Sequence, residues 1–202
     1  MRTVLRSLSV LLIAGSVSAA GPPACGLIVQ VDQSDPAWAA GGVTEELVRG
    51  FSRNAWLRVI IPDLSARTAP AFPTDAYNLD SLLNWGAEIG GSFLLYVDVR
   101  EERLERRKTL HLPLVCHKYE TQAVVEGELR LMDLNEGTLK MAEPFRVERK
   151  AARVFQATMD DDIGDPDLKV PAPAKVRLFG ELEEELAARI IKQVEPVLRG
   201  DE

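Results

Sequence analysis

Residues 124–149 read VVEGELRLMDLNEGTLKMAEPFRVER, and this stretch decides the fold. In its first half, apolar residues and one glycine alternate with mostly charged residues, which is the period of two that a β-strand requires. The apolar set is Val125, Gly127, Leu129 and Leu131, and the alternating set is Glu126, Glu128, Arg130 and Met132. The apolar parity runs back through Ala123, Thr121 and Tyr119, and it resumes after the turn at Leu139, Met141, Phe145 and Val147. Two long strands joined by a glycine-containing turn therefore form a predicted β-hairpin.

A hairpin with one apolar face needs neighbouring strands and covering helices to be stable in water. Three earlier segments are rich in apolar and β-branched residues and predict strands, at 26–31, 56–61 and 92–99. The last of these is almost unbroken apolar sequence, which is typical of a central strand covered on both faces. Pro144 lacks a backbone donor, so we expect the second strand of the hairpin at an edge of the sheet.

Three segments have the period of an amphipathic helix. In the first, Val43, Leu47 and Phe51 fall four residues apart, and the second begins after Asn78 and stops at a glycine pair. The third is the longest, with apolar positions at Phe179, Leu182, Leu186, Ile190, Val194 and Val197. The order strand, helix, strand, helix, strand, strand, strand, helix predicts an α/β (α+β) fold. We expect a mixed sheet of about five strands with the long C-terminal helix packed on it.

The N-terminus predicts export. Arg2 and Arg6 precede a short apolar run, and Val17-Ser18-Ala19 offers small residues at the spacing that a signal peptidase accepts. We therefore expect a signal peptide at 1–19 and an exported, periplasmic protein with no transmembrane segment in the mature chain. Lipidation at Cys25 is the alternative, although prolines stand before it where a lipobox needs an aliphatic residue.

Composition predicts one acidic domain. Loss of Arg2 and Arg6 would lower the basic residues from 24 to 22, against 31 acidic residues, for a net charge of −9. Such a charge makes nucleic acid an unexpected partner. Residues 20–202 are long enough for a single α/β domain, and an acidic, proline-containing loop is expected at about 156–174.

The two cysteines, Cys25 and Cys116, leave two interpretations open. In an oxidising compartment they predict a disulfide, which would close a loop of about 90 residues and contribute some 4 kcal/mol in the chain-entropy model. The alternative is two separate buried thiols. No Cys-x-x-Cys pattern is present, so we do not expect a redox catalyst.

The stretch Arg100–Lys108 has eight charges in nine residues and predicts a solvated extension of the third strand into a protruding turn. Four of its five basic residues also form the predicted interaction site, because a cationic element on an acidic protein can steer an acidic partner. These residues are Arg103, Arg106, Arg107 and Lys108.

Candidate chemistry is sparse. Asp160, Asp162 and Asp165 are the candidate metal ligands, but Gly164 and Pro171 do not fit the positions of a calcium loop. The two histidines, His111 and His117, do not form a His-x-x-x-His pair and need not share a face. There is no Gly-x-Ser-x-Gly elbow and no glycine-rich phosphate loop. We therefore expect no catalytic residues and no cofactor.

Three segments carry a resemblance to a known family: Leu57-Arg58-Val59-Ile60-Ile61, Ile89–Val97 and Leu129–Leu139. They resemble the family that includes the N-terminal domain of the Tol-system protein TolB and the periplasmic domain of the curli-secretion lipoprotein CsgG. The chain departs from that family in having no lipobox, no pair of membrane-inserting hairpins and no downstream propeller, so a secretion pore is not implied. The resemblance implies an envelope accessory domain that binds other proteins.

The function predicted from the sequence is therefore a non-enzymatic envelope accessory protein that acts by protein–protein interaction in envelope assembly or secretion. Its partners would be envelope proteins that dock on a sheet edge or on the covering helix. Two alternatives stay open at this point. One is a metal-dependent or other small hydrolase whose site is built from distant residues, and the other is a small-ligand-binding periplasmic protein with an apolar pocket beside the central strand.

Overall fold

The computed structural model describes residues 25–33, 42–62, 70–75, 77–112, 116–151 and 170–200, with the backbone alone described over 106–112 and 116–120. The predicted signal peptide at 1–19 and most of the predicted loop at 156–174 lie outside these residues. The described elements are β1 (Cys25–Gln33), α1 (Gly42–Phe51), β2 (Leu57–Ile60), α2 (Leu79–Ile89), β3 (Phe93–Leu112), β4 (Cys116–Asp133), β5 (Thr138–Lys150) and α3 (Ala172–Arg199).

The strands form one mixed sheet in the order β2-β1-β3-β4-β5. β1 runs parallel to both β2 and β3, whereas β3, β4 and β5 are antiparallel neighbours. Parallel strands need a crossover, and α1 and α2 supply the two that this sheet requires. The predicted fold class, the central place of β3 and the edge position of β5 are all confirmed.

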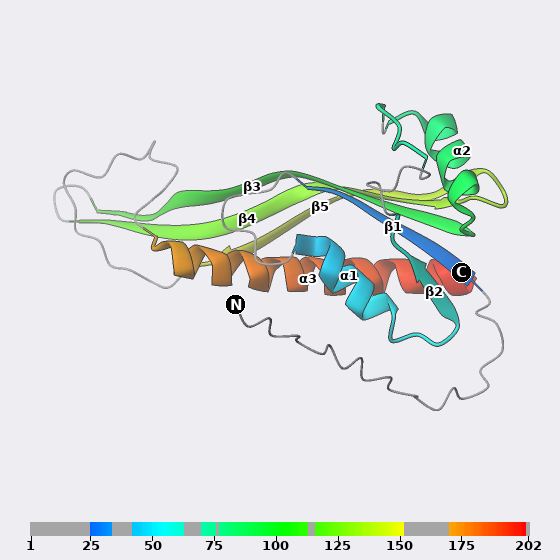
Figure 1. The fold of residues 1–202 in the computed structure, drawn as a ribbon. Coiled ribbons are helices and arrows are strands. Elements are labelled where there is room, and N and C mark those ends of the chain that lie inside the picture. The colour runs from blue at the N-terminus through cyan, green and yellow to red at the C-terminus, as the bar shows by residue number, and fades with distance from the viewer. Residues whose placement is uncertain are drawn as a thin grey trace, which may run out of the picture.

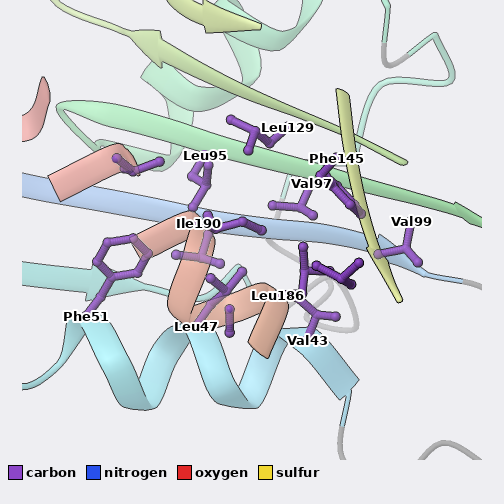
Figure 2. Close-up of a cluster of buried hydrophobic side chains, with 14 of the residues drawn as sticks. Val43, Leu47, Phe51, Leu95, Val97, Val99, Leu129, Phe145, Leu186 and Ile190 are labelled. Atoms are coloured by element: carbon purple, nitrogen blue, oxygen red, sulfur yellow. The ribbon is translucent and has the colours of Figure 1, made fainter. Parts of the chain in front are cut away.

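The helices cover the two faces of the sheet unequally. α1 and α3 lie together on one face, and α2 covers only one end of the other, called the outer face below (Figure 1). The larger core lies under α1 and α3, where Val43, Leu47 and Phe51 are fully buried against side chains of β1, β3, β4 and α3 (Figure 2). Each such side chain contributes roughly 1.5–3 kcal/mol by leaving water, so the predicted helix stripe is the face that docks.

A smaller core lies under α2 on the outer face. It joins Ile28, Leu94 and Met132 of the sheet to Leu82 and Trp85 of the helix, and all five side chains are buried. The predicted start of the helix is confirmed, because the side-chain oxygen of Asn78 accepts a hydrogen bond from the Ser81 N–H at 3.2 Å. The helix ends at Gly90, whose φ of 85° is the left-handed conformation that glycine adopts without steric cost.

β3 is the longest strand of the described residues. Its apolar pattern ends at Val99, and the charged extension predicted over Arg100–Lys108 is part of the strand, which has 20 residues and continues to Leu112. β1 pairs with β3 only as far as Val99, so beyond that point the sheet narrows to β3, β4 and β5 and projects as a ribbon (Figure 1). Arg100 is an extra residue at a β-bulge, and it shifts the parity of β3 from Glu101 to Lys108, where a second irregularity follows.

The predicted parity of the hairpin is confirmed for β4 and only in part for β5. Leu131 faces Met141, but the next pair is Met132 with Leu139, so Lys140 is an extra residue in β5. A one-residue bulge moves the residues beyond it to the opposite face. The prediction that Leu139 shares the core face was therefore wrong, and its side chain is 43% exposed.

Two predictions concern segments that the structure describes only in part. The acidic loop was expected at about 156–174, and α3 begins near its end at Ala172, with a proline in its first turn where the missing N–H has no intrahelical partner to lose. Of the two interpretations of the cysteines, the structure favours separate thiols, because Cys25 is free and buried, whereas the side chain of Cys116 lies outside the described residues. Cys25 lies beside Leu57 at one end of the sheet, whereas Cys116 pairs with Leu112 at the far end of β3, separated by roughly 60 Å of extended strand.

Candidate functional site

The outer face of the ribbon carries a layer of ion pairs that spans three strands. Its members are Glu101, Arg103 and Glu105 of β3, Glu126 of β4, and Arg146 and Glu148 of β5, and these six residues are called the ion-pair layer below. The bulge at Arg100 places the three β3 residues on this face. Four carboxylates surround two guanidiniums, so the layer is acidic.

Glu126 is the link between the two arginines of the ion-pair layer. Its Oε1 lies 2.7 Å from Nη1 of Arg103, and its Oε2 lies 2.6 Å from Nη1 of Arg146. The hydrogen bond from Arg103 is the main cause that holds the pKa of Glu126 below its ordinary value. Val124, which lies between Arg103 and Glu148 in the strand register, is fully buried, so we infer that the long side chains of the layer also shield an apolar position.

A second polar cluster borders α2. The hydroxyl of Tyr77 donates to Asp98 Oδ2 at 2.7 Å and accepts from Arg100 Nη2 at 2.9 Å. The guanidinium of Arg130 lies 4.5 Å from the centre of the Tyr77 ring, and Arg130 also forms an ion pair with Glu128. Tyr77 is 54% exposed, so this cluster is a polar surface and not a buried site.

The structure changes the role of the predicted cationic site. The backbone of Arg100–Lys108 is continuous strand within β3, so the predicted extension of the strand is confirmed, but the protruding turn does not lie there. Arg103 is paired with three carboxylates and is not a free cation. The side chains of Arg106, Arg107 and Lys108 lie outside the described residues, so their part in the interaction site stays a prediction.

The candidate metal ligands all fall outside the part of the chain that the structure describes. Asp160, Asp162 and Asp165 lie outside the described residues, and a metal site there remains untested. Among the residues that the structure describes, no three His, Cys, Asp or Glu side chains are placed to hold a metal ion. The backbone register sets His111 directly opposite His117 across β3 and β4, a pairing that the sequence did not predict.

Two features of the β5 edge hinder the pairing of another strand. Nη1 of Arg189, on α3, donates to the backbone carbonyl of Arg146 at 3.3 Å, which shows that this carbonyl points away from β4. Alternate residues of an edge strand point their backbone groups outward, so Pro144 also stands at an outward position, where its missing donor costs no ladder hydrogen bond. A strand approaching this edge would find one donor missing and one acceptor occupied.

The β2 edge is different. The Cys25 N–H donates to the Trp56 carbonyl at 3.3 Å, so the backbone groups of residue 56 face β1. Successive residues of a strand point their backbone groups to opposite sides. The N–H and C=O of Val59 therefore lie on the side away from β1. Ile61, directly after the strand, is 56% exposed, the highest value among the exposed large apolar side chains of the described residues. Within the part of the chain that the structure describes, this edge therefore offers unpaired backbone groups beside an exposed apolar side chain.

Sequence reasoning missed one buried polar cluster, formed by Gln33, Glu102 and Glu183. Glu102 was assigned to a solvated stretch, but the bulge at Arg100 turns it toward α3. Glu183 was assigned to a charged helix face, although it stands four residues after Phe179 and three before Leu186, within the apolar stripe. That spacing was the available signal for a buried acid, and Glu183 is 2% exposed.

Comparison with known proteins gives the fold neighbours. No family model and no curated protein sequence matches the chain. A hypothetical protein from Chlamydia trachomatis, CT253, is similar in structure over 87% of this chain and 98% of its own, with 15% identity and a TM-score of 0.46. A minor lipoprotein from Acinetobacter baumannii is similar over 84% of this chain and 90% of its own, with 12% identity and a TM-score of 0.43. Lipoprotein GNA1162 from Neisseria meningitidis is similar over 85% of this chain and 98% of its own, with 13% identity and a TM-score of 0.42.

Two of these three structures are thus bacterial lipoproteins, but identities and TM-scores at this level assign neither a family nor a function. The predicted TolB-like and CsgG-like relationship stays a prediction. In the described part of the chain, no helix is both long and apolar enough to cross a membrane.

Proposed function

We propose that this chain is a non-enzymatic accessory domain of the cell envelope that binds another protein by accepting a strand at the β2 edge of its sheet. The observation that carries the proposal is the contrast between the two edges. At β5 an edge carbonyl is occupied by Arg189 and an edge donor is replaced by Pro144, whereas β2 presents the backbone of Val59 with Ile61 exposed beside it.

Strand addition suits this geometry for two reasons. The backbone of the added strand gains hydrogen bonds whatever its sequence, and side-chain contacts then select the partner. Val59 and Ile60 are only partly buried and Ile61 is exposed, so the edge favours an apolar or β-branched segment. Placement in the envelope rests on the predicted signal peptide at 1–19.

The test is a site-specific photo-crosslinker placed in the native envelope. A probe at Ile61 should capture a partner, whereas the same probe at Glu148 on the β5 edge should not. Val59→Pro removes an N–H that faces away from β1, so the domain should fold and the Ile61 crosslink should be lost. Arg58→Pro is the matched control, because its N–H faces β1 and its loss should lower the melting temperature.

Equal capture from both edges, or capture that survives Val59→Pro in a folded protein, would contradict docking at β2. In the second case the surface of α3 or the ion-pair layer would become the better candidate.

A further inference from the structure

A pair of glutamates on α3 and β3 shares one half-buried amide, that of Gln33. Nε2 of Gln33 donates to Glu102 Oε1 at 2.7 Å and to Glu183 Oε1 at 3.1 Å. Glu183 is 2% exposed, and Oε2 of Glu102 is buried without a hydrogen-bond partner in the described residues. Three elements far apart in the sequence, β1, β3 and α3, therefore meet at one polar group.

The same amide holds the beginning of α1. Oε1 of Gln33 accepts a hydrogen bond from the Val43 N–H at 3.2 Å. This N–H is one of the N-terminal donors that have no partner inside a helix. The first turn of α1 is thus attached through Gln33 to the two glutamates.

The charge balance at this point is unfavourable when both glutamates are ionised. The charged groups of α1 that act on Glu183 are Glu46 and Glu45, which are also carboxylates. Across the sheet, the residues in line with Glu102 are the apolar Val125 of β4 and Val147 of β5. Two neighbouring carboxylates in a desolvated place cannot both ionise without cost.

We propose that Glu102, Gln33 and Glu183 form a proton-dependent clasp, which holds the first turn of α1 against β3 and α3 while one carboxyl is protonated and loosens when both are ionised. The clasp would make the attachment of α1 respond to acidity, independently of which partner the β2 edge binds.

The pKa shifts of Glu102 and Glu183 determine whether the clasp is stabilised at low or at high pH. Burial, opposed by the hydrogen bond from Gln33 and reinforced by the charge of Glu183, raises the pKa of Glu102 to about 7, and burial also raises the pKa of Glu183. A carboxyl with a raised pKa in the folded state binds its proton more tightly than the unfolded chain does. Its stabilising effect is complete below the ordinary value of 4.5 and is lost as the pH rises to about 7.

Amide hydrogen exchange measured by NMR on the protein purified from its host tests the clasp. The protection factor of the Val43 amide, corrected for intrinsic exchange, should fall by about tenfold between pH 5 and pH 7. The Leu82 amide, bonded to the Asn78 carbonyl at the start of α2, serves as the internal control and should not change. Glu102→Gln should abolish the pH dependence at Val43, whereas Glu88→Gln, on the exposed surface of α2, should leave it intact.

A Val43 protection factor that is constant across this range in the parent overturns the proposal, as does the same fall in Glu102→Gln. Should Glu102→Gln not fold, the side-chain carboxyl carbon of Glu102 can be titrated by NMR in the parent. A midpoint near 4.5 would then exclude the clasp, and a midpoint near 7 would support it.

Discussion

Arg189 of α3 donates a hydrogen bond to the backbone carbonyl of Arg146 at 3.3 Å, so a helix side chain occupies an acceptor on the outer edge of β5. Exposed sheet edges are templates for pairing with other chains, and proteins blunt them with charges, prolines and covering groups. The contact contributes little to stability, because its arginine is exposed. We infer that this contact hinders another strand from pairing with the edge.

Arg189→Ala should therefore leave the free energy of unfolding within about 1 kcal/mol of the parent but increase self-association. Sedimentation velocity at rising protein concentration measures this directly. Arg177→Ala is the matched control on the same helix, since the Arg177 side chain is 76% exposed and, among the described residues, forms an ion pair only with Glu181 of α3. If both variants stay monomeric to the same concentration, Pro144 alone closes the edge.

Gly127→Ala should destabilise the fold strongly. A Cβ at this position would lie 1.9 Å from the Asp98 carbonyl oxygen and 2.8 Å from the Phe145 ring, and backbone cannot move aside cheaply. We expect a loss of about 2–4 kcal/mol in urea unfolding. Gly26→Ala is the control, because its nearest neighbour would be at an ordinary 3.5 Å, and it should cost less than about 1 kcal/mol.

Leu131→Asp should cost several kcal/mol, because it places a charge at a fully buried position of the larger core. Arg130→Asp, one residue away on the outer face, should cost about 1 kcal/mol by removing the contact with Tyr77 and the ion pair with Glu128. Thermal unfolding of the two variants compares them. Equal shifts in melting temperature would mean that the parity of β4 is wrong.

Strand parity and helix stripes could be predicted because burial imposes them on each segment separately. Val43, Leu47 and Leu131 were placed correctly from spacing alone. The bulges at Arg100 and Lys140 could not be predicted in this way, because an extra residue is defined by the partner strand and not by its own sequence.

The candidate site depended on those bulges. The strand extension over Arg100 to Lys108 was predicted, but its charges were expected to be solvated, whereas Arg103 and Glu105 form ion pairs with β4 and β5. A polar face held by cross-strand partners has no apolar period to detect. One of the two features that distinguish the β5 edge from the β2 edge, the hydrogen bond of Arg189, likewise joins residues 43 positions apart in the sequence.

The ion-pair layer should make stability fall in acid. The pKa of Glu126 is held below its ordinary value, chiefly by Arg103, so its contribution is present above about 4.5 and is lost as the pH falls through the lowered value. As the pH is lowered below 4.5, the melting temperature of the parent should fall. The melting temperature of Glu126→Gln should fall less over the same pH range. Glu88→Gln controls for the general effect of removing a carboxyl. Salt should weaken the difference, because exposed pairs are screened.

The last prediction concerns Cys25 and the predicted export. Cys25 is the first residue of β1, its side chain is 8% exposed within the larger core, and burial raises the pKa of its thiol. A diacylglyceryl group on this sulfur would have to displace the neighbouring core side chains, so the geometry favours an unmodified thiol. We expect the intact mass of the protein from its native envelope to match cleavage near Ala19 with a free Cys25. Because the thiol is buried, a small alkylating reagent should label it only after unfolding. A mass that corresponds to an acylated chain beginning at Cys25 would instead require the first residue of β1 to leave the core. It would also mean that a lipid anchors the domain to a membrane.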